Sequence, residues 1–210
     1  MNKRLIPRLM IITSIILWAI FFNQLPDQVP MQWGVDGSVN WYGSKKIAFL
    51  INNGALIFTY LLLYILPKID PKRKNYQQFS RSYRITFYTV IGILFIINLF
   101  VLFTSLGHQL KLHFFIPILV GLLMIIMGNY MQTFKPNWFI GIRTPWTLSN
   151  KEVWRKTHRL GSKIFILLGF ILILMPFVPE TLVFPAILIS TIIGVLIPIG
   201  YSYYLYQKID

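Results

Sequence analysis

The sequence predicts an all-α integral membrane protein with six transmembrane helices and both termini in the cytoplasm. Three observations lead to this prediction. Of the 210 residues, 56% are hydrophobic and only 12% are charged, which is about half the charged fraction of a typical soluble domain. The charged residues gather in short clusters between long apolar runs. The clusters are also unevenly placed along the chain, and that placement indicates the number and direction of the spans.

Six apolar runs are long enough to cross the hydrocarbon core as helices, which takes about 20 residues. The first has Pro7 and Arg8 in its opening turns, where proline is tolerated and arginine can extend to the interface. No small-residue cleavage site follows it, so we expect it to be retained. The fifth run is the weakest because it contains Pro176, and a tight helical hairpin is expected to join it to the sixth. The predicted spans are 5–25, 47–66, 85–106, 112–131, 161–179 and 182–206.

The basic residues predict the orientation. Seventeen of the 20 Lys and Arg residues fall on one side of the membrane if the number of spans is even, and only Lys45, Lys46 and Lys111 fall on the other. Basic segments stay in the cytoplasm, so we expect a multi-pass protein of a bacterial cytoplasmic membrane. The expected parts are an N-terminal hairpin at 1–66 with an extracellular loop rich in Pro, Gly and Trp, a basic cytoplasmic loop at 67–84, and a four-helix region at 85–210. That last region contains a cytoplasmic loop at 132–160.

The composition also limits the chemistry. The sequence has no cysteine and only six acidic residues, which leaves little material for carboxylate catalysis, and we cannot assemble a nucleophile, a base and oxyanion donors. We therefore expect no enzyme activity, no catalytic residue, no metal site and no cofactor. The net charge is +14, and most of the basic residues border the apolar runs. We therefore expect contact with anionic lipid, for example at residues 72–74, and no nucleic-acid partner.

The loop at 132–160 contains more turn signals than a flexible connector needs. Pro136 and Pro145 each sit in a turn-forming context, Lys-Pro-Asn and Thr-Pro. Gly141 is expected to adopt a backbone conformation that other residues resist. For each tryptophan and arginine taken singly, anchoring at the bilayer interface is as good an explanation as a functional role. Together, however, the signals predict an ordered structure.

A helix is expected to begin near Asn150. Ser149 followed by Glu152 has the spacing of a capping box. On this helix Trp154 and His158 lie on one face because they are four residues apart. The helix is amphipathic, so we expect it to lie at the membrane interface before it continues into the fifth span.

The run KPNWFIGIRTPWTLS at 135–149, followed by Val153-Trp154 and Thr157-His158-Arg159, closely resembles the signature of the SdpI family. These are bacterial membrane proteins that give immunity to a secreted sporulation-delaying peptide toxin. The resemblance implies immunity, with a peptide toxin as partner on the outer side. In some members it also implies signalling, in which a transcriptional repressor is held at the cytoplasmic surface of the membrane. The candidate residues of this signature loop are Asn129, Lys135, Pro136, Asn137, Gly141, Arg143, Thr144, Trp146, Ser149, Glu152, Trp154, Thr157 and His158.

The expected outer loop carries a second resemblance, to the outer-loop motif of a domain of unknown function that often precedes the SdpI region. Gln32 and Asn40 depart from that motif, because histidine and aspartate are common at these two positions. Any metal or proton chemistry of that pair is therefore not expected here. The matching runs are Leu25-Pro26, Val29-Pro30, Trp33, Gly37 and Gly43-Ser44-Lys45. The candidate residues of the outer loop are Pro26, Pro30, Trp33, Gly37 and Lys45.

Two other functions stay open from the sequence: a transporter or exporter of small molecules or peptides, and a structural partner subunit. Asn52, Asn53 and Asn98 lie within predicted spans. They can bond neighbouring helices or line a polar path for a substrate. No span has an ionisable residue deep inside, which disfavours proton-coupled transport.

Overall fold

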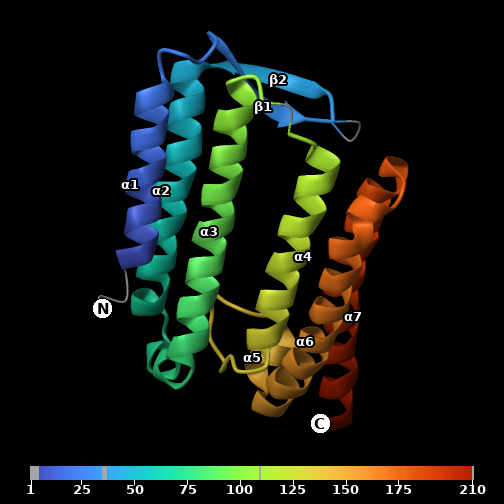
Figure 1. The fold of residues 1–210 in the computed structure, drawn as a ribbon. Helices are drawn as coiled ribbons and strands as arrows, with labels where there is room; N and C mark the ends of the chain where they lie inside the picture. The colour runs from blue at the N-terminus through green and yellow to red at the C-terminus, as the bar shows by residue number, and fades with distance from the viewer. Residues whose placement is uncertain (1–4, 35–36, 109, 210) are drawn as a thin grey trace. The chain divides into compact units, whose positions relative to one another are not determined.

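The computed structural model describes residues 5–34, 37–108 and 110–209, without the side chains of residues 112 and 113. In these ranges the chain forms seven α-helices, three 3-10 segments and one antiparallel pair of strands (Figure 1). The helices are α1 (Leu5–Phe21), α2 (Lys45–Ile69), α3 (Ser80–Ser105), α4 (Leu112–Met131), α5 (Pro145–Ser149), α6 (Lys151–Leu174) and α7 (Val183–Ile209). The strands are β1 (Gln28–Trp33) and β2 (Val39–Ser44), and the 3-10 segments are η1 (Arg73–Phe79), η2 (Met175–Phe177) and η3 (Glu180–Leu182).

Each predicted span corresponds to one apolar helix. The helices α2, α3, α4, α6 and α7 are long and apolar enough to cross a membrane, and α1 is a shorter apolar helix of 17 residues. Little of this apolar surface is covered by protein: in the most apolar window of α2 only 11% of the residues are buried. An apolar surface of this extent is suited to lipid and not to water. The prediction of a multi-pass helical membrane protein is confirmed, while the orientation stays a prediction.

The expected outer loop contains a β-hairpin that the sequence analysis did not predict. Strands β1 and β2 pair antiparallel, with Val29 opposite Gly43 and Pro30 opposite Tyr42. The register shifts twice after Pro30, as expected for a strand whose proline lacks an amide hydrogen. Val29 is fully buried and packs with Trp18 in a cluster at this end of α1 and α2. The loop is therefore a folded cap held by apolar contacts.

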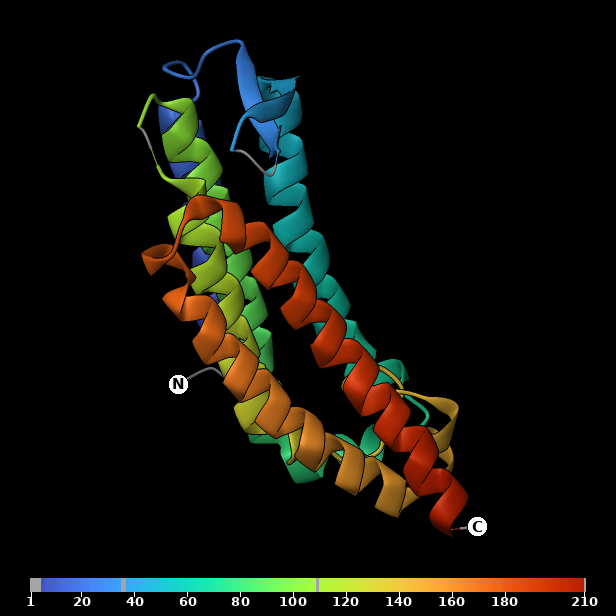
Figure 2. The same ribbon diagram turned by 90° about the vertical axis from the view of Figure 1, so that its right-hand side faces the viewer.

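The expected amphipathic helix and the fifth span are one continuous helix, α6. It begins at Lys151, ten residues before the predicted start of the span. Its first three turns bury Val153, Trp154, Thr157 and His158, whereas Lys151 and the other charged side chains there lie at or near the surface. Two 3-10 segments, η2 and η3, form the tight connection to α7, so the predicted helical hairpin is present. Figure 2 shows α6 and α7 running in opposite directions.

Two compact units divide the chain. The first unit comprises residues 1–63 and 87–115, and the second comprises 64–86 and 116–210. In the first unit the Ser14 hydroxyl donates to Asn53 Oδ1 at 2.7 Å, and the Trp18 indole N–H donates to Asn98 Oδ1. These buried bonds join α1 to α2 and α1 to α3. They favour the interpretation that the asparagines within the predicted spans form hydrogen bonds between helices.

In the second unit, α4 and α6 approach each other closely at small residues. A Cβ on Gly121 would lie 2.6 Å from the Gly169 carbonyl oxygen, and a Cβ on Gly169 would lie 2.6 Å from the Gly121 oxygen. Seven residues along, a Cβ on Gly128 would lie 2.8 Å from the Ser162 oxygen. Backbones can come this close only where side chains are absent or small. The contact fixes the helix that follows the signature loop against α4.

Candidate functional site

The signature loop folds around the side chain of Asn137, which is fully buried. Its amide nitrogen donates to the carbonyl oxygens of Lys135 and Ile140 at 2.9 and 3.0 Å. Its amide oxygen accepts from the backbone N–H groups of Phe139 and Ile140 at 2.9 and 2.7 Å. This one side chain therefore replaces the backbone pairing that the turn after Pro136 lacks.

Asp70 joins the first basic loop to the signature loop. Its side chain is 1% exposed. One carboxylate oxygen accepts from the backbone N–H of Lys72 at 2.7 Å, and the other accepts from the Tyr76 hydroxyl at 3.0 Å and from the backbone N–H of Trp138 at 2.9 Å. Hydrogen bonds to a charged acceptor are stronger than neutral ones. Three of them hold this carboxylate in its buried position.

Two further residues of η1 strengthen this connection. The Asn75 side chain donates to the Pro136 carbonyl oxygen at 2.7 Å, and the Tyr76 hydroxyl lies 3.4 Å from Asn137 Oδ1. The Tyr76 ring packs in a buried cluster that also contains Phe134. The sequence analysis did not select Asp70, Asn75 or Tyr76. The signal that was available is a single acidic residue in an otherwise basic segment, directly before a proline.

Gly141 and His158 meet in a close contact. Gly141 has φ of +107°, and a Cβ at this position would overlap His158 Nε2. His158 Nε2 accepts from the backbone N–H of Ile142 at 3.1 Å, and Nδ1 lies 2.8 Å from the Trp154 carbonyl oxygen. An acceptor at Nε2 and a donor at Nδ1 define the neutral imidazole with its proton on Nδ1. The expectation that Gly141 takes an unusual conformation agrees with this geometry.

Trp154 is the largest buried side chain of the loop helix. It is 1% exposed, and its indole N–H donates to the Phe134 carbonyl oxygen at 2.8 Å. Its ring stacks on the His158 ring with centroids 4.1 Å apart and an interplanar angle of 20°. Trp154 and His158, one turn apart on α6, thus form hydrogen bonds with the beginning and the middle of the signature loop, at Phe134 and Ile142. Thr157, also fully buried, has a hydroxyl with no hydrogen-bond partner among the described residues.

The second half of the loop is attached to α7. Thr144 is the N-cap of α5: its hydroxyl accepts from the Thr147 N–H at 3.1 Å, and the Thr147 hydroxyl accepts from the Thr144 N–H at 2.9 Å. The Thr144 hydroxyl also lies 3.0 Å from the Ser202 hydroxyl of α7. The rings of Trp146 and Tyr203 have centroids 5.0 Å apart. Thr144 and Trp146 were predicted as loop residues, whereas Thr147, Tyr203 and Ser202 were missed.

The predicted capping box at Ser149 and Glu152 is wrong. Asn150 is the N-cap of α6, and its side-chain oxygen accepts from the N–H groups of Glu152 and Val153 at 2.8 and 3.2 Å. Ser149 belongs to α5 and donates to the Trp146 carbonyl oxygen at 3.1 Å instead. Asn150 can cap because it is the single extended residue between two helices. The Glu152 carboxylate is left to pair with Lys156 Nζ at 2.9 Å.

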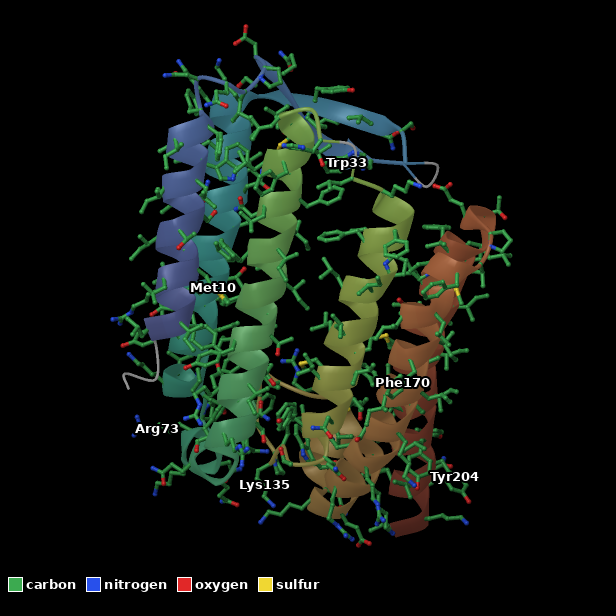
Figure 3. All side chains as sticks on the ribbon, in the orientation of Figure 1. Met10, Trp33, Arg73, Lys135, Phe170 and Tyr204 are labelled. Atoms are coloured by element: carbon green, nitrogen blue, oxygen red, sulfur yellow. The ribbon has the colours of Figure 1, made fainter. Side chains whose placement is uncertain are left out.

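Six of the predicted signature residues are exposed at the surface: Asn129, Lys135, Gly141, Arg143, Ser149 and Glu152. The Arg143 guanidinium donates to the Trp138 carbonyl oxygen, so it is positioned although it is exposed. Beside the loop lies a cavity of 580 Å³ lined by Asn75, Gln78, Gln132, Phe134, Lys135, Pro136, Lys151, Glu152, Trp154 and Arg155. Arg73 and Lys135 mark the basic end of this second unit (Figure 3). The charged residues of the cavity lining are the basic Lys135, Lys151 and Arg155 and the acidic Glu152.

The candidate residues of the expected outer loop are all in the first unit. Pro30 is buried in β1, Pro26 is exposed, and Gly37 has φ of +76°. The Trp33 ring packs edge-on against Phe100 with centroids 5.7 Å apart. Lys45 Nζ lies 3.1 Å from Asp27 and donates to the Leu25 carbonyl oxygen at 3.4 Å. In the ranges described, no group of three His, Cys, Asp or Glu side chains could hold a metal ion.

These observations define the class of protein: a multi-pass helical membrane protein with a folded hairpin in one unit and a hydrogen-bonded basic loop in the other. Residues 133–202 match the SdpI/YfhL protein family, and residues 9–56 match a domain of unknown function, DUF1648. The chain is 28% identical over 210 residues to Immunity protein SdpI of Bacillus subtilis (strain 168), which covers 100% of this chain and 99% of that protein. The resemblance to the SdpI family is therefore confirmed. The chain is a multi-pass protein of a bacterial cell membrane. No solved structure matches it.

Proposed function

We propose that this chain is a membrane immunity protein that protects its cell against a secreted peptide toxin. The observation that carries the proposal is the similarity to Immunity protein SdpI along the whole of both chains. The two matched segments support it because they include the folded hairpin and the signature loop. The relative is named for immunity and not for a catalysed reaction. Protection needs no chemical step from the residues described above.

The toxin is engaged at the hairpin end of the first unit. Two adjacent aromatic side chains of β2, Trp41 and Tyr42, are 46% and 52% exposed. Large aromatic rings at a membrane boundary bind amphipathic peptides well, since they offer apolar area with a polar edge. An apolar groove of 490 Å³ lies nearby in the same unit, lined by Ala19, Phe22, Asn23, Lys46, Phe49 and Leu50. A peptide that is partly inserted in the membrane can place its apolar face in such a groove.

The signature loop serves as the cytoplasmic docking surface for a repressor protein. Its backbone is held by buried bonds to Asp70, Asn137 and His158, so its exposed side chains have defined positions. The exposed Lys135, Lys151 and Arg155 line the cavity beside it. Basic side chains around a partly apolar hollow favour an acidic protein segment as the bound partner. Anionic lipid neutralises the basic residues that face the membrane.

The immunity proposal is tested by producing the chain in a toxin-sensitive bacterium and measuring survival after toxin addition. We expect protection compared with the empty vector at matched amounts of membrane protein. The double variant Trp41→Ser with Tyr42→Ser should reduce protection, because it removes exposed aromatic area at little cost in stability. Unchanged killing of cells that contain the wild-type protein in their membrane would refute the immunity role.

The signalling proposal has a separate measurement. A candidate repressor, chosen as a small DNA-binding protein encoded beside this gene, is labelled and co-produced, and its membrane-bound fraction is measured before and after toxin addition. We expect toxin to increase that fraction, and Lys135→Glu with Arg155→Glu to prevent the increase without reducing survival. If the labelled repressor stays soluble in protected cells, the loop is not a docking surface.

A further inference from the structure

A second, basic hollow lies between α6 and α7 and shares no lining residue with the cavity beside the signature loop. It has a volume of 250 Å³ and is lined by Lys156, Arg159, Leu160, Lys163 and Tyr201. The three basic residues of α6 in this set, Lys156, Arg159 and Lys163, are three, four or seven positions apart, so they share one face of the helix. Three cationic side chains and one tyrosine ring from the facing helix therefore surround a single space.

The charge in this hollow is only partly balanced by the protein. Lys156 Nζ lies 2.9 Å from Glu152. Neither Arg159 nor Lys163 pairs with a carboxylate in the part of the chain that the structure describes. Like charges that share a small space repel one another unless an anion lies between them. The hollow thus has the charge of an anion site with two cations still available.

The hollow also lies at the boundary between the charged and the apolar part of α6. Beyond Lys163 the helix has no charged residue to its end at Leu174. One turn beyond Lys163 on the same face, Leu167 is 62% exposed, and one turn from Tyr201 on α7, Ile197 is 48% exposed. In a membrane these side chains contact hydrocarbon. An anion in the hollow is therefore next to a path suited to acyl chains.

We propose that this hollow binds the headgroup of an anionic phospholipid, whose acyl chains lie along Leu167 and Ile197. The Arg159 guanidinium binds two phosphate oxygens at once, whereas Lys163 acts as a point charge. Tyr201 provides the amphipathic ring that is typical of the headgroup level. This site goes beyond the immunity function because its ligand is a lipid and not the toxin, although Arg159 belongs to the family signature. It shares no lining residue with the cavity beside the signature loop.

The experiment measures lipid binding to the full-length purified protein in detergent by native mass spectrometry. Phosphatidylglycerol is compared with phosphatidylcholine for the wild type, for Arg159→Gln with Lys163→Gln, and for the control Arg81→Gln with Lys68→Gln, which lies outside the basic run at residues 72–74. Both pairs are exposed and remove the same charge. We expect the hollow variant to bind phosphatidylglycerol about 25-fold more weakly, since each of the two basic residues contributes about fivefold and the factors multiply. The control should stay within about twofold of the wild type.

Additional measurements separate this site from its alternatives. Arg159→Lys keeps the charge, so it should retain most of the binding and shows that a loss in the glutamine variant is not a folding defect. Equal losses in the hollow and control variants, or no loss in either, would overturn the proposal. So would binding of water-soluble glycerol 3-phosphate with the affinity of the lipid, which would indicate a free phosphate site. Binding of an acidic peptide in place of lipid, abolished by the same variant, would indicate a protein docking surface.

Discussion

The hairpin and the signature loop carry similar residues but use them in opposite ways. In the hairpin, Trp41 and Tyr42 are about half exposed, and the ion pair between Asp27 and Lys45 lies at the surface. At the signature loop the residues that hold the backbone are buried: Trp154 is 1% exposed, and Asp70, which bonds to the loop from the first basic loop, is also 1% exposed. Trp138 of the same loop, however, is 44% exposed. The difference teaches that the buried signature residues build the loop, whereas the two exposed aromatic residues of the hairpin, Trp41 and Tyr42, contribute little to its packing.

Matched substitutions in the two regions test this comparison, and glycine gives the largest expected effect. Gly141→Ala should lower the free energy of unfolding by about 3 kcal/mol, because the new Cβ overlaps His158 and the positive φ is strained. Gly37→Ala should cost only about 1 kcal/mol, since φ is positive there too but a Cβ would meet nothing within 4 Å. Unfolding by SDS in mixed micelles measures both. Equal losses would mean that the contact with His158 has no role.

The second-largest loss of stability is expected from substitution of the buried carboxylate of Asp70. Asp70→Asn should destabilise the protein by about 2 kcal/mol, because an amide places a donor toward groups that are themselves donors and removes the charge. Hydrogen exchange should become faster at the backbone amides of Lys72 and Trp138. The control Asp27→Asn removes an exposed ion pair, with the Asp27 side chain 92% exposed, so little change is expected. Unchanged exchange at Trp138 would contradict the role given to Asp70.

Of the three pairs of substitutions, the tryptophan pair is expected to change stability least. Trp154→Phe retains the stacking ring but loses the hydrogen bond to the Phe134 carbonyl oxygen, at a cost of about 1 kcal/mol. Trp41→Phe should leave stability unchanged because the side chain is exposed. Thermal unfolding followed by circular dichroism in detergent distinguishes the two. A greater loss of stability for Trp41 than for Trp154 would reverse the comparison.

Much of the helical layout could be predicted from the sequence because its signals are local. Apolar runs indicate the spans, and a spacing of four residues places Trp154 beside His158. The start of α6 near Asn150 was also predictable, although the capping side chain was not. Asn150 competes with its neighbour Ser149 for that role, and the short α5 that takes Ser149 depends on Thr144 and Thr147.

The rest of the site depends on contacts between distant parts of the chain. Asp70 and Trp138 are 68 residues apart, and Thr144 and Ser202 are 58 apart. No periodicity within either segment reports such a pairing. The hairpin was missed for a related reason, since Pro30 and two register shifts interrupt the alternation that indicates strands. The glycines of α4 and α6 were visible in the sequence, but their partners were not.

The contact of α4 with α6 has a mechanical consequence. Gly121 and Gly128 are seven residues apart, as are their partners Gly169 and Ser162, so the two helices touch backbone to backbone over about 10.5 Å. With only glycines and one serine at these points, the two backbones are in direct contact. We therefore expect a displacement of α4 along its axis to carry α6 with it, and Trp154 and His158 on α6 to move together with α4.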